Sequence, residues 1–159
     1  MNEVFFLLGS NLGDRTLFLQ QAIAHIMDEI GPVIKKSSVY ETQSWGKTDL
    51  PDYLNQVVLV NTKLTARDTL EKILLIEHKI GRIREEKWGA RTIDIDILFF
   101  NSDIIDELRL QVPHPELHKR KFTLEPMVEL APSLMHPILK KNILQLKNEL
   151  NDSLIVKKL

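Results

Sequence analysis

Two aspartates separated by one residue, Asp94 and Asp96, are the side chains of this sequence best suited to chemistry. They lie in the run from Ile93 to Phe100, which is otherwise apolar and rich in Ile and Phe, as a buried strand is. Because successive side chains on a strand point to opposite faces, both carboxylates share one face. Two adjacent carboxylates favour a bound divalent cation, and a pair of such cations can clamp a transferring phosphoryl group and its attacking oxygen.

Four basic residues and a tryptophan precede this strand in a polar stretch. They are Arg82, Arg84, Lys87, Trp88 and Arg91. Guanidinium groups bind phosphate oxygens in pairs, so the arginines would hold the remaining phosphate charge. The alternative is that the two aspartates form salt bridges with Arg84 and Arg91 on an exposed sheet face. The short motif leaves both interpretations open.

The composition of the 159 residues is that of an ordinary globular protein, and one domain over residues 1–159 is expected. The net charge of −1 argues against nucleic acid and against an anionic membrane as a partner. With no cysteine, the sequence excludes a disulfide framework, a thiolate zinc site and a cysteine nucleophile. No apolar run reaches membrane-spanning length and the first residues lack the features of a signal peptide, so a cytoplasmic location is expected.

Hydrophobic periodicity and turn residues predict the order β-α-β-β-α-β, followed by further helices. Strands are expected over residues 3–8, 33–40, 53–62 and 93–100, and helices over residues 17–30 and 65–80. A short edge strand over 108–112 and helices over 117–130 and 142–150 complete the prediction. This order indicates an α+β fold with a ferredoxin-like core, a mostly antiparallel sheet and extra C-terminal helices.

Several other residues invite a functional interpretation without requiring one. The turn from Gly9 to Gly13 follows a strand and precedes a helix, yet it fits neither G-x-G-x-x-G nor a Walker A loop, so a helix cap at Asn11 or Asp14 is favoured. His114 stands between two prolines, which suits either a positioned ligand contact or a turn. The basic run from Lys119 to Phe122 is either a solvated face or a second phosphate clamp.

The stretch from Trp88 to Ile97 closely resembles the signature of the 6-hydroxymethyl-7,8-dihydropterin pyrophosphokinase family of the folate pathway. The resemblance extends over nearly the whole chain, in order and at the expected spacings. It also includes Gly9–Gly13, Pro51–Gln56, Glu77, Gly81–Arg84, Val112–Pro115 and Arg120–Phe122.

The resemblance implies transfer of pyrophosphate from ATP to the hydroxymethyl group of the dihydropterin, with release of AMP. It implies that Asp94 and Asp96 hold two Mg²⁺ ions between ATP, the co-substrate, and the pterin hydroxyl. Arg82 and Arg91 would lie on a mobile loop that closes over ATP and stabilises charge on the transferring group.

Two sets of binding residues are implied by the same resemblance. The ATP-binding set is Arg82, Arg84, Arg91, Ile97, Arg109, His114 and Arg120. The pterin-binding set is Thr42, Gln43, Trp45, Tyr53, Asn55, Trp88, Asp94 and Phe122. Tyr53 and Phe122 would sandwich the flat ring, while Asn55 would bind its donor and acceptor edge.

Rival functions differ in what they predict. A nucleotidyltransferase or cyclase can use paired aspartates on a similar fold but would release pyrophosphate instead of AMP. An RNA-binding module lacks support, because no aromatic side chains are arranged on the strands as a stacking platform. A non-catalytic homologue would not retain Asp94, Asp96, Arg82 and Arg91. The resemblance implies ATP and the dihydropterin as ligands and a monomer as the expected state.

Overall fold

The computed structural model describes residues 1–43, 52–81 and 92–159. A six-stranded sheet runs through its centre, with the strand order β5-β1-β4-β3-β8 and with β2 also paired to β4. Every pairing in this sheet is antiparallel. The strands are β1 (Asn2–Ser10), β2 (Val33–Lys36), β3 (Tyr40–Thr42), β4 (Tyr53–Thr62), β5 (Asp94–Phe100) and β8 (Val156–Lys158).

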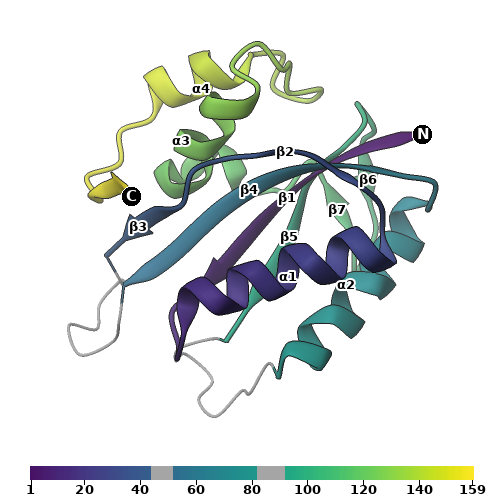
Figure 1. Ribbon diagram of the computed structural model, residues 1–159. Coiled ribbons are helices and arrows are strands. Elements are labelled where there is room, and N and C mark those ends of the chain that lie inside the picture. Colours follow the sequence, from purple (N-terminus) through teal and green to yellow (C-terminus); the bar gives the residue numbers. More distant parts are fainter. Residues whose placement is uncertain (44–51, 82–91) are drawn as a thin grey trace.

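Helices cover both faces of the sheet, so the molecule has three layers (Figure 1). Helices α1 (Arg15–Glu29) and α2 (Ala66–Ile80) lie together on one face. Helices α3 (Lys121–Leu130) and α4 (Ile143–Glu149) pack against each other on the opposite face. The predicted α+β fold with a ferredoxin-like β-α-β-β-α-β core is confirmed.

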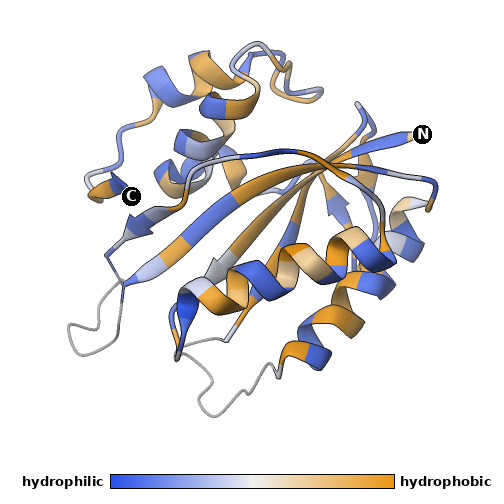
Figure 2. Ribbon diagram, in the orientation of Figure 1, coloured by the Kyte–Doolittle hydropathy of each residue, from blue (hydrophilic) through white to orange (hydrophobic). Residues whose placement is uncertain are grey.

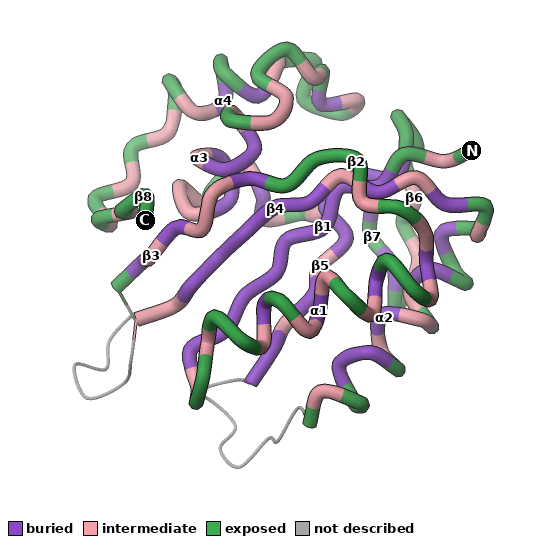
Figure 3. Tube along the Cα trace, in the orientation of Figure 1, coloured by how far each residue is buried: buried purple, intermediate pink, exposed green. Residues whose placement is uncertain are grey.

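The two faces of the sheet carry separate hydrophobic cores. Val4, Phe6 and Leu8 of β1 contact the α1–α2 layer, whereas Phe5 and Leu7 point to the α3–α4 layer. This division follows from the alternation of side chains along an extended strand. The central strands are accordingly apolar along most of their length and buried (Figures 2 and 3).

The helix boundaries follow the predicted caps. The Asp14 carboxylate accepts a hydrogen bond from the Leu17 amide at 3.1 Å, so Asp14, one of two predicted candidates, caps α1. The Thr65 hydroxyl likewise accepts from the Asp68 amide at 3.1 Å at the start of α2. Helix α2 ends at Gly81, which has a left-handed φ of 89°.

One predicted strand is divided in the structure. The segment predicted as a strand over 33–40 forms β2 and β3, with residues 37–39 between them. At this interruption the Ser37 amide donates to the Val57 carbonyl at 2.8 Å, and the Ser37 hydroxyl accepts from the Val57 amide at 3.0 Å. Side-chain bonding by a buried serine therefore replaces part of the regular ladder, which period-two hydrophobicity does not reveal.

The helix predicted over 117–130 is also divided. A 3₁₀ turn, η1 (Leu117–Lys119), precedes α3, and Arg120 between them is extended with φ −124° and ψ 111°. The short strand predicted over 108–112 is reduced to β7 (Gln111–Val112), which pairs with β6 (Ile105–Asp106). Strand β8 was not predicted. None of the helices in the described ranges is long and apolar enough to span a membrane.

Candidate active site

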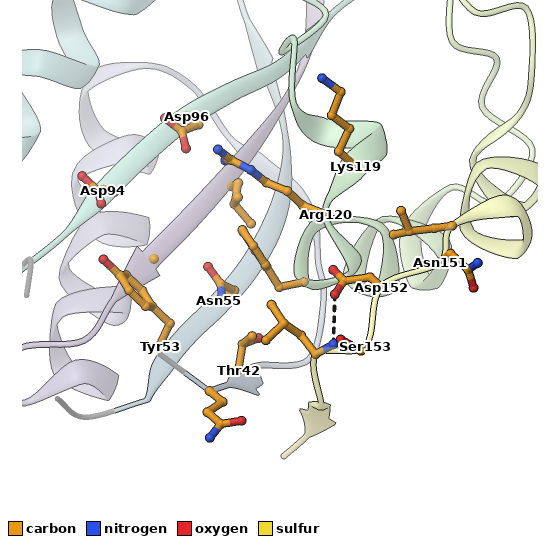
Figure 4. A pocket seen from close by; sticks show the side chains of 16 residues that line it. Thr42, Tyr53, Asn55, Asp94, Asp96, Lys119, Arg120, Asn151, Asp152 and Ser153 are labelled. Atoms are coloured by element: carbon orange, nitrogen blue, oxygen red, sulfur yellow. Dashed lines mark hydrogen bonds between the residues drawn. The ribbon is translucent and has the colours of Figure 1, made fainter. Parts of the chain in front are cut away.

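A cavity of about 700 Å³ opens on the α3–α4 side of the sheet (Figure 4). The sheet supplies its floor, the start of α3 one wall, and the segment that follows α4 another. The lining residues are Leu7, Gly9, Thr42, Gln43, Tyr53, Asn55, Asp94, Asp96, Lys119, Arg120, Phe122 and Leu150 to Leu154.

The strand register brings the polar side chains of the floor together. Gly9 is opposite Asp94 on one side and opposite Asn55 on the other. Directly opposed residues of antiparallel strands point to the same face, so the Asp94 carboxylate and the Asn55 amide flank a position without a side chain. Asp96 is opposite Leu7 in the next row on the same face.

Gly9 leaves the space between these two side chains open. A Cβ atom built at this position would lie 3.0 Å from Asn55 Oδ1 and 3.9 Å from Tyr53 Cδ1. The position therefore tolerates a larger residue only if Asn55 moves. Since Asn55 is itself buried, a side chain at position 9 would narrow the floor of the pocket.

Asp94 and Asp96 are the residues that could hold a metal ion. Both are half-buried on β5, both line the pocket, and the Arg120 side chain extends toward Asp96 from the opposite wall (Figure 4). Across the described residues no group of three or more His, Cys, Asp or Glu side chains is placed to hold a metal. Two carboxylates alone suit Mg²⁺, which uses few protein ligands and keeps other positions for phosphate and water.

The strand that carries the two aspartates is fixed from the other side of the sheet. The Glu77 carboxylate of α2 accepts a hydrogen bond from the Ile95 amide at 2.9 Å, and both residues are buried. Strand β5 is an edge strand, so this amide is not used in the ladder to β1. Glu77 therefore satisfies the one backbone donor that lies between the two carboxylates.

His114 lies close to two charged residues of the pocket, Asp96 and Arg120. Its Nδ1 accepts a hydrogen bond from the Glu116 amide at 3.1 Å, which leaves Nε2 to carry the proton in the neutral ring. Burial lowers the pKa of His114, with Asp96 opposing this shift and Arg120 adding to it. A neutral histidine with Nε2–H as its free donor suits contact with an anionic or polar group of a ligand.

Thr42 has an unsatisfied hydroxyl at the edge of the pocket. Its side chain is buried, with 3% of its surface exposed, and its Oγ1 has no hydrogen-bond partner among the described residues. Buried hydroxyl groups are normally bonded. Thr42 lines the cavity beside Tyr53, its partner in the β3–β4 register. Its hydroxyl is therefore able to form a hydrogen bond with a polar atom of a ligand.

Arg120 and Phe122 are in contact at the start of α3. The Arg120 guanidinium carbon lies 5.6 Å from the centroid of the Phe122 ring, a cation–π distance. The extended backbone at Arg120 and the helical turn that follows let both side chains face the pocket. The structure thus joins a predicted ATP contact to a predicted pterin contact.

One further ion pair fixes the strand ends beside the pocket. Arg15 at the start of α1 donates to the Glu41 carboxylate at 3.0 Å and to the Asp52 carbonyl at 2.7 Å. Glu41 is the middle residue of β3, and Asp52 directly precedes β4. Arg15 therefore holds together the two strands that carry Thr42 and Tyr53.

The predicted site residues divide into three groups. The pocket brings together Thr42, Gln43, Tyr53, Asn55, Asp94, Asp96, Arg120 and Phe122, with His114 near Asp96 and Arg120. The Ile97 side chain lies in the core on the opposite face, and Arg109 is exposed between β6 and β7 and does not line this pocket. Trp45, Arg82, Arg84, Trp88 and Arg91 lie outside the described residues, as does the alternative in which Arg84 and Arg91 pair with the aspartates.

The sequence prediction did not include two parts of the pocket, the wall formed by residues 150–154 and the floor position at Gly9. No local motif marks residues 150–154, because their position depends on β8 pairing with β3. Gly9 was interpreted as part of a turn, whereas it is the penultimate residue of β1. A glycine inside a strand pattern, which often marks a close approach, was the signal available.

The pocket of this α+β fold combines paired carboxylates with a facing arginine, which suits an enzyme that acts on phosphate groups. Residues 5–132 match the family model described as 7,8-dihydro-6-hydroxymethylpterin-pyrophosphokinase (HPPK). The 2-amino-4-hydroxy-6-hydroxymethyldihydropteridine pyrophosphokinase of Aquifex aeolicus is 40% identical over 149 residues, covering 94% of this chain and 92% of the relative. The enzyme of the same name from Bacillus subtilis is 42% identical over 133 residues, covering 82% and 80%.

The solved structures agree in fold. A Plasmodium falciparum HPPK-DHPS chain superposes with a TM-score of 0.76 at 20% identity, covering 93% of this chain and 44% of that longer chain. The chain therefore belongs to the HPPK family, and its activity is that of an ATP-dependent pyrophosphokinase of folate biosynthesis.

Proposed function

We propose that the cavity between the sheet and the start of α3 is the active site for this activity. There the chain transfers the pyrophosphoryl group of ATP to the hydroxymethyl group of 6-hydroxymethyl-7,8-dihydropterin, giving AMP and the pterin diphosphate. The observation that carries the assignment is that Asp94, Asp96, Asn55 and Arg120 line the same pocket. These are carboxylates for a metal, an amide for a heterocycle edge and a guanidinium for phosphate.

The pterin would lie on the floor of the pocket. Tyr53 and Phe122 supply aromatic faces for the flat ring, and Gly9 leaves room beneath it. The Asn55 amide and the unsatisfied Thr42 hydroxyl offer hydrogen bonds to the donor and acceptor edge of the ring. Gln43 also lines the pocket, Trp45 is expected as a further pterin contact, and Trp88 is expected to seal the site from water.

The phosphates of ATP would lie between β5 and the start of α3. Arg120 would be one phosphate contact within the described pocket, and His114 Nε2–H is a further donor beside it. Because the Ile97 side chain is in the opposite core, its contribution to ATP binding would come from its backbone. Arg82, Arg84 and Arg91 are expected to complete the cationic wall, and Arg109 is exposed and would contact ATP only outside the cavity.

Asp94 and Asp96 would hold two Mg²⁺ ions. When bound, Mg²⁺ neutralises phosphate charge and lowers the pKa of a coordinated hydroxyl. The carboxylates position the metal site on rigid strand β5, and the pterin-binding residues orient the hydroxymethyl group toward it. Arg82 and Arg91 would stabilise the negative charge that develops on the transferring group, and Trp88 would exclude water.

The expected assembly is a monomer with one catalytic domain over residues 1–159, as the family resemblance implies. Size-exclusion chromatography with light scattering tests this directly. The cytoplasmic location expected from the sequence stays a prediction.

Analysis of the reaction products tests the proposed function. The protein is incubated with ATP, Mg²⁺ and 6-hydroxymethyl-7,8-dihydropterin, and the nucleotides and pterins are resolved by chromatography. AMP and pterin diphosphate in equal amounts, formed only with Mg²⁺ present, are the expected result. ADP would indicate transfer of a single phosphoryl group, and free pyrophosphate would indicate nucleotidyl transfer; either would overturn the proposal.

A further inference from the structure

The segment from Leu150 to Leu154, here called the C-terminal strap, forms a wall of the pocket. It leaves α4, whose Ile143 and Leu146 are buried in the α3–α4 core, and enters β8, which pairs with β3. The pairing places Val156 opposite Thr42. The strap is therefore anchored at both ends and spans the side of the pocket between the helices and the sheet edge (Figures 1 and 4).

The strap is bonded to the start of α3 through one side chain. The Asp152 carboxylate accepts a hydrogen bond from the Lys121 amide at 3.3 Å through Oδ2 and from the Leu154 amide at 2.9 Å through Oδ1. Lys121 is the first residue of α3, and the residue before it, Arg120, provides no side-chain cap. Asp152 thus supplies from 31 residues away the carboxylate cap that the helix lacks locally.

We propose that Asp152 is a positioning residue for pyrophosphoryl transfer, which holds the start of α3 so that Arg120 and Phe122 face the substrates. The two residues flank Lys121 directly, and both line the pocket. Movement of the Lys121 amide would carry the guanidinium and the aromatic ring with it. This inference rests on the proposed function, because it assumes that Arg120 and Phe122 contact ATP and the pterin.

The bond can be removed from either side. Asp152→Ala deletes the acceptor. Lys121→Pro deletes the donor, since proline has no amide hydrogen, and it suits the first position of a helix. The extended backbone at Arg120 is also the conformation that a residue preceding proline adopts. Lys121→Ala is the matched control, because it removes the same side chain and keeps the amide.

The measurements are kcat and KM for the pterin, with the dissociation constant of 6-hydroxymethyl-7,8-dihydropterin measured by calorimetry. We expect Asp152→Ala and Lys121→Pro each to raise KM and the dissociation constant about tenfold, in line with loss of a charged hydrogen bond. The double variant, Asp152→Ala with Lys121→Pro, should have the same KM and dissociation constant as either single variant, because both substitutions remove the same hydrogen bond. Lys121→Ala should match the wild type.

A merely structural role for Asp152 predicts a different pattern. It would lower the fraction of folded enzyme, which reduces the apparent kcat and leaves the pterin KM unchanged. An unchanged KM in Asp152→Ala, or effects of the two variants that add, would overturn the inference while an active wild type upholds the proposed function. A wild-type protein that forms no AMP would instead overturn the proposed function itself.

Discussion

The Glu77 carboxylate on α2 accepts the Ile95 amide at 2.9 Å, at the one residue of β5 that lies between Asp94 and Asp96. This bond connects the α1–α2 layer, which has no part in the pocket, to the strand that carries the candidate metal ligands. Because β5 is at the edge of the sheet, β1 holds it from one side only. Glu77 is therefore the residue that keeps the spacing of the two carboxylates rigid.

Substitution of Glu77 should reduce both stability and turnover. Glu77→Ala leaves a buried amide unsatisfied, which should lower the free energy of unfolding by about 2 kcal/mol, whereas Glu77→Gln keeps an acceptor and should cost about 1 kcal/mol. Urea unfolding and kcat measured for both variants check this. Equal stability of Glu77→Ala and the wild type would show that the bond does not hold the strand.

Enlarging Gly9 should impair pterin binding without unfolding the protein. In Gly9→Ala the added Cβ would press on Asn55 Oδ1 at 3.0 Å, at a position whose backbone any residue can adopt. We expect the pterin KM to rise about tenfold, as for loss of a side-chain hydrogen bond, and the melting temperature to change little. Gly9→Ser should raise the pterin KM more than Gly9→Ala does. A wild-type KM in both variants would mean that the pterin does not lie over Gly9.

Thr42 should show opposite effects on stability and on binding. Thr42→Val replaces an unsatisfied buried hydroxyl by a methyl group of similar size, so stability should stay the same or increase by about 1 kcal/mol. Pterin affinity should fall about fivefold if the hydroxyl bonds the ring edge. Thermal melting and calorimetric titration separate the two effects. Loss of stability with unchanged affinity would refute the assignment of Thr42 to the pterin edge.

His136 should make the fold sensitive to mild acid. Its Nδ1 accepts hydrogen bonds from the Ile138 and Leu139 amides at 3.2 and 3.1 Å, and protonation of Nδ1 would remove both. Burial, with a smaller effect of nearby His118, lowers the pKa of His136 below its ordinary 6.5. As the pH falls, His136 therefore binds a proton in the unfolded chain before it does so in the folded chain. The stabilisation that neutral His136 provides is fully present above pH 6.5 and declines as the pH falls below that value.

The variant His136→Asn isolates this effect. An asparagine side-chain oxygen can accept from both amides but does not titrate in this range. The melting temperatures of the variant and the wild type are compared between about pH 5 and pH 8, so that contributions of other groups, His114 among them, cancel in the difference. We expect the wild type to lose stability more steeply on acidification. Parallel curves would contradict the assignment.

The sequence predicted the parts of this molecule that depend on local patterns. Apolar periodicity and the caps at Asp14 and Thr65 gave the helices, and the alternation around Asp94 and Asp96 placed both carboxylates on one face. The interruption at Ser37 was missed because a buried serine bonds the neighbouring strand there. The C-terminal strap was missed because its place is set by tertiary pairing of β8, for which the sequence carries no local signal.

The central claim is that Asp94 and Asp96 hold the metal ions for pyrophosphoryl transfer in the described pocket. The most direct test measures AMP formation across a Mg²⁺ series for the wild type, Asp94→Asn and Asp96→Asn. Asp103→Asn is the matched control, because Asp103 is exposed just beyond the other end of β5. Circular dichroism and thermal melting verify that each variant is folded.

We predict that each of the two site variants loses turnover by about a thousandfold or more at every Mg²⁺ concentration, as expected when a charge-stabilising group of the transition state is removed. The control should keep wild-type turnover. The account would be contradicted if a folded Asp94→Asn or Asp96→Asn variant kept turnover within about tenfold of the wild type. Such a loss is smaller than a charge-stabilising group contributes.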